Sequence, residues 1–354
     1  MDFIDFKTSS NDTDRRFDTL LRKFLPQMPL SLVYKNIRTG FIRLNNKKAK
    51  QETKIQVGDI INIEKRLFEK FSSLSDYTSN DVNKNLQSEE NIKKNADFIN
   101  KITLFKNNNI LILNKPYNIN VQDSKNDKNS LDKIVKSIYI KDSLTFVPGP
   151  MHRLDKLTTG IICFSQNLQC ARWFSEQITN HSIQKYYLAI LEGKLLEKQE
   201  WIDYLEKDDE VSKNGMHKSK VTSNYETSET EEFSESSFNG KKAITIIEPI
   251  SYGKYKNIDI TFAKIFIPTG RNHQIRLQCS SRGYPILQDS LYDSKISKEK
   301  NDFEQKLYLH CYKMIFQKNE FDIPLEVNSP IPDSFEKALK KCLIETTFQV
   351  YTIY

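Results

Sequence analysis

The spacing of apolar residues predicts a small module at the start of the chain. Apolar residues recur at helical spacing over residues 17–25, and two prolines end this helix before a second one, which Ser31 can cap. Gly40 ends the second helix, the alternating residues 41–44 predict a strand, and residues 57–63 predict a turn followed by another strand. Residues 13–66 are therefore expected to form one compact α+β domain.

The pattern changes twice in the remainder of the chain. Residues 67–100 are polar and predict a linker, with one short helix near Ile92 to Ile99. Apolar runs at 110–113 and 161–164 then predict buried strands of a second domain, residues 101–350. Residues 221–239 hold five glutamates and no basic residue, which predicts a flexible acidic insertion in that domain.

The positive charge is concentrated in the first module. The 354 residues carry a net charge of +7, whereas residues 15–66 hold thirteen Lys or Arg against four acids, which gives a local charge of +9. Such a patch is the electrostatic footprint of phosphate-backbone binding, although charge runs are also common on solvated surfaces. Lys35 and Arg38 share one face of the second predicted helix. The candidate RNA contacts of the module are Arg22, Lys35, Arg38, Arg43, Lys47 and Lys48.

Composition and motifs argue against several classes of protein. No apolar run approaches the ~20 residues of a membrane span, and the acidic N-terminus lacks the features of a signal peptide. The five cysteines are scattered without Cys-x-x-Cys spacing, which indicates reduced thiols in a cytoplasmic protein. The histidines lack metal-ligand spacing, and neither a Walker-type loop nor G-x-G-x-x-G is present. We therefore expect no metal and no cofactor.

Asp155 is the strongest candidate for chemistry carried by side chains alone. It stands between Arg153 and the turn 158–160, just before the apolar run 161–164. A carboxylate beside a cation and next to a buried strand can stay ionised while shielded from water, as a nucleophile or general base requires. The alternative is that Asp155 only caps a turn or the start of a helix.

The run at 152–160, H-R-L-D-x-x-T-T-G, resembles the signature of the RluA-type RNA pseudouridine synthases. Other blocks of that family follow in the same order, at 185–193 (K-x-Y-x-A-x-x-x-G), 240–245 (G-K-x-A-x-T), 269–277 (T-G-R-x-H-Q-I-R-L), 283–289 and 309–311. The resemblance spans residues 101 to 345. It implies a mixed, largely antiparallel sheet flanked by helices, and isomerisation of uridine to pseudouridine in RNA.

The resemblance also implies catalytic roles. Asp155 is the nucleophile, and whether it attacks the ribose or assists formation of a glycal stays open. Arg276 is its buried ion-pair partner, the alternative being a surface arginine on a strand over residues 274–277. Tyr187 stacks on the target base and has been proposed as a proton-transfer group, and Leu277 packs on the other face of the base.

Further residues of these motifs are expected to bind the substrate or support the site. Arg153 matches a family position suggested to fill the space that a flipped base leaves, and pairing with a phosphate is an equal alternative. His273 and Lys115, like His152, are expected to be structural or to contact RNA, and Arg271 shares the motif of His273.

The first module resembles the S4 (αL-type) RNA-binding domain over residues 13–65, where two helices and a basic strand precede a V-G-D-x-I ending. Its presence favours large-subunit ribosomal RNA, or its precursor, as the substrate of a monomeric enzyme, and a tRNA synthase is the alternative. A non-catalytic RNA-binding factor of ribosome assembly is a second alternative. The set of Asp155, Tyr187 and Arg276 argues against it.

Overall fold

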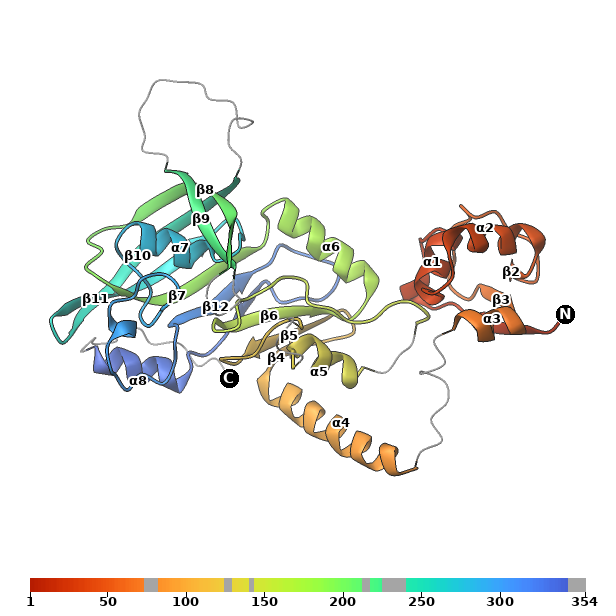
Figure 1. The fold of residues 1–354 in the computed structure, drawn as a ribbon, viewed down its shortest axis with the longest axis horizontal. Coiled ribbons are helices and arrows are strands. Elements are labelled where there is room, and N and C mark those ends of the chain that lie inside the picture. The colour runs from red at the N-terminus through yellow and green to blue at the C-terminus, as the bar shows by residue number, and fades with distance from the viewer. Residues whose placement is uncertain (73–81, 124–128, 140–142, 212–216, 225–239, 343–354) are drawn as a thin grey trace, which may run out of the picture.

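The computed structural model describes all residues except 73–81, 124–128, 140–142, 212–216, 225–239 and 343–354 (Figure 1). The N-terminal module combines helices with a three-stranded antiparallel sheet in the order β1-β3-β2. Its elements are β1 (Phe3–Lys7), α1 (Phe17–Phe24), α2 (Leu30–Thr39), β2 (Ile42–Leu44), β3 (Ile60–Glu64) and α3 (Lys65–Phe71). Phe17, Leu21 and Val33 of the helices share one buried core with Ile61 and Ile63 of the sheet.

Both predicted helices and both predicted strands of this module are confirmed. Gly40 ends α2 at a φ of +84°, where glycine avoids the strain of a side chain. The cap predicted at Ser31 is wrong, because α2 begins at Leu30 and Pro29 occupies the cap position. Strand β1 was not predicted, and it extends the sheet by pairing with β3.

The linker expected at residues 67–100 is helical at both ends. Leu67, Phe68 and Phe71 of α3 pack against the core of the N-terminal module. Helix α4 (Val82–Ile102) is much longer than the predicted short helix, and Ile99 is buried in the core of the second domain. Each end of this stretch therefore belongs to the domain next to it, and residues 73–81 between them lie outside the description.

The second domain is built on a ten-stranded mixed sheet (Figure 1). The strands run in the order β4 (Thr103–Lys106), β5 (Ile110–Lys115), β6 (Thr159–Ser165), β12 (Leu309–Ile315), β7 (Gln184–Glu192), β11 (Ile258–Ile267), β10 (Lys241–Tyr255), β8 (Gln199–Val211) and β9 (His217–Asn224), with β13 (Glu326–Asn328) paired to β12. Among the described strands, β6 and β12 form the one parallel pair, so the expected mixed and largely antiparallel sheet is confirmed.

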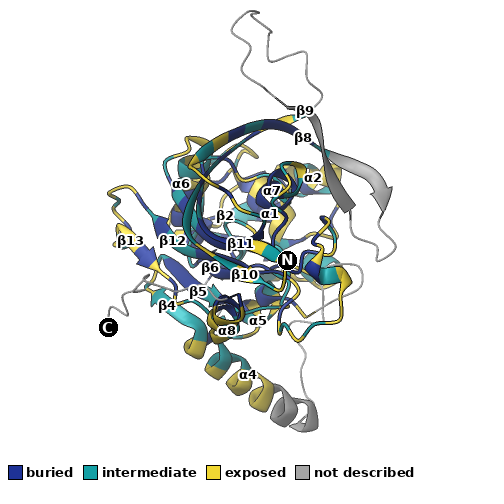
Figure 2. Cartoon of the chain, turned by 90° about the vertical axis from the view of Figure 1, so that its left-hand side faces the viewer, coloured by how far each residue is buried: buried dark blue, intermediate teal, exposed yellow. Residues whose placement is uncertain are grey.

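Helices accompany the sheet, and its central strands are buried. The helices are α4 and then α5 (Leu131–Ser137), α6 (Leu168–Thr179), α7 (Gln274–Ser281) and α8 (Asp333–Lys341). Figure 2 shows buried residues along the central strands, whereas much of α4 is exposed. The apolar runs 110–113 and 161–164 lie in the buried strands β5 and β6, as the sequence predicted.

Gly160 brings β6 unusually close to β12. It has a φ of +105°, and a Cβ at this position would collide with the backbone carbonyl of Cys311. Beside it, the Thr159 hydroxyl lies 2.8 Å from Nδ1 of His310. Gly160 is the second residue of β6, so the turn expected at 158–160 instead lies earlier, at Lys156 and Leu157. The close approach at Gly160 fixes the start of β6, and with it the preceding loop that carries Asp155, against the centre of the sheet.

The acidic insertion predicted at 221–239 begins later than expected. Its first residues, up to Asn224, form the end of β9 and pair with β8, while residues 225–239 lie outside the description. No helix in the described part of the chain is long and apolar enough to span a membrane.

Candidate active site

A cavity of about 760 Å³ opens beside the start of β6. Its wall comes from two segments far apart in the sequence, together with side chains of β7 and β12. The first segment is the loop 150–155, and the second runs from the end of β11 to the first turn of α7 and contributes residues 267, 268 and 270–276. Of the residues singled out in the sequence, the cavity is lined by Asp155, Arg276, Tyr187, Arg153, Arg271, His152 and His273. The fold thus gathers most of the candidate residues around one opening.

Arg276 lies between two carboxylates. Its Nη1 donates to Oδ2 of Asp155 at 3.1 Å, while its Nε and Nη2 donate to the two carboxylate oxygens of Asp289 at 2.8 and 2.9 Å. The side chains of Arg276 and Asp289 are almost fully buried, whereas that of Asp155 is 26% exposed. Asp155 is thus the carboxylate that substrate can reach, and Asp289 holds the arginine in place.

Charge explains why the guanidinium is tolerated at this depth. Burial alone would lower the pKa of Arg276, but its hydrogen bonds to Asp289 and the charges of Asp289 and Asp155 raise it above its ordinary value. The guanidinium also lies over the ring of Tyr292, 5.1 Å from the centroid. Arg276 therefore stays charged and places a positive charge beside the Asp155 carboxylate.

His273 completes the surroundings of Asp155. Its Nε2 lies 3.7 Å from Oδ2 of Asp155, and its Nδ1 lies 2.9 Å from the hydroxyl of Tyr292. Burial, more than any charge, lowers the pKa of His273, so that the ring is neutral at pH 7. Arg276 therefore supplies the positive charge next to Asp155.

The alternative strand over residues 274–277 is wrong, because these residues form the first turn of α7. Successive residues of a helix point about 100° apart, so Arg276 and Leu277 face different surroundings. Leu277 packs with Leu205 and Tyr292 in a small apolar cluster and is not among the residues that line the cavity. Its expected place against the base is not supported, and Ile275 is the apolar residue of this turn that reaches the cavity.

Tyr187 lies on β7 with its side chain at the cavity and its ring largely buried. Burial and the neighbouring Cys311 raise the pKa of Tyr187 well above its usual value of 10. The phenol is therefore neutral at physiological pH, which suits a ring that packs against a base.

Lys115 and His152 have structural surroundings. Lys115 is fully buried, and its Nζ donates to the carbonyl oxygens of Pro116 and Lys156 at 3.0 Å each. Burial lowers the pKa of Lys115 to about 7. Of the two roles expected for Lys115, these contacts favour the structural one, support of the loop at Asp155, over contact with the substrate. His152 accepts a hydrogen bond from the backbone N–H of Cys163 at 3.2 Å.

The two remaining arginines of the motifs, Arg153 and Arg271, differ in exposure and in hydrogen bonding. Arg153 is exposed at the edge of the cavity, where RNA can reach it. Arg271 also lines the cavity, but its Nε donates to the backbone carbonyl of Lys242 at 2.9 Å. Lys185, which received no role from its motif, lines the same cavity with a largely buried side chain.

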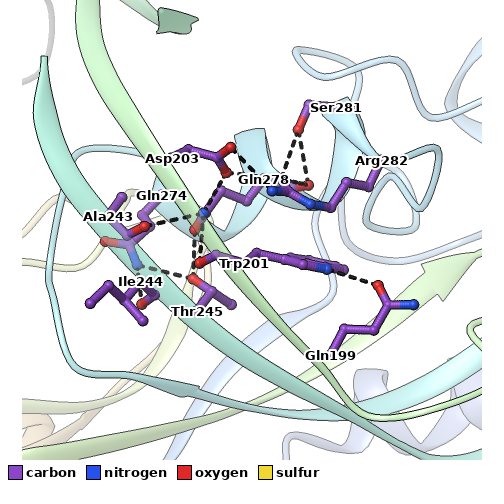
Figure 3. Close-up of polar contacts among 10 residues, drawn as sticks. All are labelled: Gln199, Trp201, Asp203, Ala243, Ile244, Thr245, Gln274, Gln278, Ser281 and Arg282. Carbon is purple, nitrogen blue, oxygen red and sulfur yellow. Dashed lines mark hydrogen bonds and ion pairs between the residues drawn. The ribbon is translucent and has the colours of Figure 1, made fainter. Parts of the chain in front are cut away.

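A buried polar network attaches α7 to the sheet (Figure 3). Gln278 donates to the carboxylate of Asp203 on β8 at 2.6 Å and accepts from the Thr245 hydroxyl on β10 at 2.6 Å. One turn earlier, Gln274 donates to the same hydroxyl at 3.0 Å, and Arg282 pairs with Asp203 through both terminal nitrogens. The helix that carries Arg276 is thereby held at both ends.

Replacing Gln278 with Ala is expected to lower the free energy of unfolding by about 2 kcal/mol. The change leaves buried polar groups of Asp203 and Thr245 without their Gln278 partner, and each such group costs roughly 1–3 kcal/mol. Urea unfolding measures the difference, with Gln317→Ala as an exposed control of the same chemistry. Equal stability of the two variants would contradict a structural role for the network.

Asp289 and Tyr292 are the site residues that sequence reasoning missed. Asp289 ended one of the quoted motifs but received no role, because nothing near it in the sequence indicates a partner. The paired carboxylate appears only when the loop after α7 folds back onto Arg276. Among the described residues, no group of three or more His, Cys, Asp or Glu side chains is placed to hold a metal ion.

Comparisons with known proteins find similarity to RNA pseudouridine synthases. A family model described as RNA pseudouridylate synthase matches residues 109–281. The Haemophilus influenzae protein named ribosomal large subunit pseudouridine synthase C is 27% identical, over 94% of this chain and 93% of that protein. A Mycoplasma capricolum protein named as an uncharacterized RNA pseudouridine synthase is 26% identical, over 88% of this chain and 91% of that protein. The solved structure of human RNA pseudouridylate synthase domain containing 4 has a similar fold, with a TM-score of 0.53 and 19% identity over 73% of this chain and 98% of that one.

Proposed function

The chain is an RluC-like RNA pseudouridine synthase, and we propose that it isomerises uridines of large-subunit ribosomal RNA with Asp155 as the nucleophile. The observation that carries the proposal is the ion pair between Asp155 and Arg276 at the wall of the cavity. It fixes a carboxylate that substrate can reach and places a positive charge beside it, which is an arrangement that suits a nucleophile.

The reaction breaks the C1′–N1 bond of a uridine and forms a C1′–C5 bond to the same uracil. The proton on C5 is lost and N1 gains one, so every other atom is retained and no cofactor is required. Oδ2 of Asp155 faces Arg276, while Oδ1 accepts no hydrogen bond from the described residues. Oδ1 is therefore the oxygen available to attack C1′ or, on the glycal path, to take a ribose proton.

The detached uracil must be held while it turns. We assign this to Tyr187 on one side of the base and to apolar residues of the cavity wall, Ile275 and Leu309. A neutral phenol favours stacking over proton abstraction by Tyr187. The uridine must first leave its stack, at a cost of a few kcal/mol, and the exposed Arg153 can take its place or bind a phosphate.

The N-terminal module, as an S4-like domain, is proposed to bind the RNA backbone. Five of its candidate cations, Arg22, Lys35, Arg38, Lys47 and Lys48, are exposed. Arg43 is only half-buried, and its guanidinium lies over the ring of Phe3 at 4.4 Å while its Nε donates to the Gly40 carbonyl. Arg43 is therefore better explained as a structural residue of this surface.

Replacing both Lys35 and Arg38 with Ala is expected to weaken RNA binding and to reduce its dependence on salt. Each lost phosphate contact lowers the slope of log affinity against log salt by about one. Filter binding at several salt concentrations measures the slope, with Lys300→Ala and Lys340→Ala together as an exposed control. A slope equal to that of the control would contradict phosphate binding by α2.

The choice of ribosomal RNA rests on the relatives. Proteins named ribosomal large subunit pseudouridine synthase C match more than nine-tenths of this chain, so the likeness includes the N-terminal module. A tRNA substrate remains the alternative. The deciding experiment is carbodiimide mapping of pseudouridine in total RNA from cells with and without the gene. Loss of signals from large-subunit ribosomal RNA supports the proposal, loss confined to tRNA overturns the substrate, and no loss favours a non-catalytic binder.

A further inference from the structure

A second cavity, of about 390 Å³, lies between the N-terminal module and the synthase domain. Arg15 and Lys23 of the module line one side, and the segment from Thr145 to Met151 lines the other. Pro150 and Met151 also line the active-site cavity, so these two residues border both cavities. A strand that crosses from the module to Asp155 can therefore pass through both.

The position of this cavity is fixed by Asp12. Its carboxylate accepts hydrogen bonds from the Ser143 hydroxyl at 2.7 Å, from the Thr145 hydroxyl at 3.0 Å and from the backbone N–H groups of Leu144 and Thr145 at 3.1 Å. Burial alone would raise the pKa of Asp12, but these bonds and the one from the Ser9 backbone lower it. An ionised, fully engaged carboxylate thus joins the module to the synthase domain.

Arg15 is a nearly buried cation with unused donors. It is 7% exposed, and its Nη1 donates to the Thr145 hydroxyl at 2.6 Å. Within the described part of the chain, no carboxylate lies within ion-pair distance of its guanidinium, and the nearby Asp12 is already engaged by Ser143 and Thr145. A guanidinium has five N–H groups, and the Thr145 hydroxyl accepts from only one nitrogen of Arg15. Because Arg15 lines the cavity, its other donors can meet an anion there.

Two further cations lie close to Arg15. Burial, and then the charges of Arg15 and Arg172, lower the pKa of Lys23, which places three cations within mutual repulsion. Lys23 and Arg172 are exposed on α1 and α6, so each is open to a ligand. Arg15 and Lys23 line the cavity, and Arg172 on α6 adds a third positive charge close to both. Such a group of cations is the arrangement that a phosphate group recognises.

We propose that this cavity binds a phosphodiester group of the RNA substrate and guides the strand from the N-terminal module into the active-site cavity. The inference deepens the proposed function, since it depends on RNA as the ligand. It assigns to Arg15, Lys23 and Arg172 a role that neither the S4-like surface nor the catalytic residues supply. The junction between the domains becomes part of the substrate path.

The test measures binding of the full-length chain to an in vitro transcript of large-subunit ribosomal RNA over a range of KCl concentrations. Lys23→Ala and Arg172→Ala are each expected to reduce the salt slope by about one. Lys340→Ala, on α8 at the opposite end of the molecule from the module (Figure 1), is the matched control and should leave the slope unchanged. Slopes for Lys23→Ala and Arg172→Ala equal to that of Lys340→Ala would overturn the proposal.

Arg15→Gln provides a second test, because it removes the charge but keeps donors for Thr145. Circular dichroism first establishes that the variant is folded, and its slope should then fall by about one as well. The unmodified enzyme is assayed for isomerisation of the same transcript. Failure of that assay counts against ribosomal RNA as the substrate. The salt slopes test phosphate binding in the cavity separately, because phosphate binding does not depend on base identity.

Discussion

Replacing Asp155 with Asn is expected to lower the rate of isomerisation by at least about 10³-fold while leaving RNA affinity nearly unchanged. Asn has the same shape, and its amide oxygen can still accept from Arg276, so the cavity keeps its walls. It lacks the negative charge that attack on C1′ or removal of a ribose proton requires. The loss should therefore appear in the chemical step.

Single-turnover release of tritium from RNA labelled at uracil C5 measures that step, because the C5 proton is lost when the new bond forms. Asp293→Asn makes the same chemical change at an exposed aspartate and should retain the full rate. Retained turnover in Asp155→Asn would mean that another group is the nucleophile. Lost RNA binding in that variant would instead assign Asp155 a role in holding the substrate.

Replacing Arg276 with Met is expected to lower the free energy of unfolding by about 3–5 kcal/mol and to reduce activity as strongly as loss of Asp155 does. Met fills a similar volume but removes the two hydrogen bonds that the buried carboxylate of Asp289 accepts from Arg276, and leaves it only the one from the Leu291 backbone. It also removes the positive charge that pairs with the Asp155 carboxylate. Structure and reactivity should therefore fail together.

A double-mutant cycle separates the two effects. Arg276→Met combined with Asp289→Asn removes both buried charges, so much of the stability should return while activity stays low. Urea unfolding measures the stability of each variant, and tritium release measures its activity on the same preparation. If the double variant is no more stable than Arg276→Met alone, the unpaired charge of Asp289 is not the source of the instability.

Motifs predicted the site better than local patterns predicted its framework. Asp155 and Arg276 are 121 residues apart, yet their motifs correctly placed them together. The turn 274–277 looked like a strand because Ile275 and Leu277 alternate with polar residues. Its helical form depends on Gln274 and Gln278, whose partners on β8 and β10 are distant in sequence.

The polar stretch at 67–100 shows the same limit. Leu67, Phe68 and Phe71 are few, but they are enough to dock α3 once the N-terminal core exists. Asp12, which joins the two domains, is one acid in an acidic terminus and carries no signal in the sequence. The helix α3 and the contacts of Asp12 depend on residues distant in the sequence, so the local sequence pattern could not predict them.

The central place of β12 determines when this enzyme can become active during its synthesis. One edge of β6 pairs with β5, which precedes β6 in the chain and so leaves the ribosome first. The other edge pairs with β12, where His310 lies 151 residues after its partner Thr159. Until residues 309–315 emerge, β6 keeps an open edge, and such edges invite aggregation. Nearly the whole chain must therefore be made before the loop of Asp155 acquires its final support, and a truncated product should be both inactive and prone to aggregate.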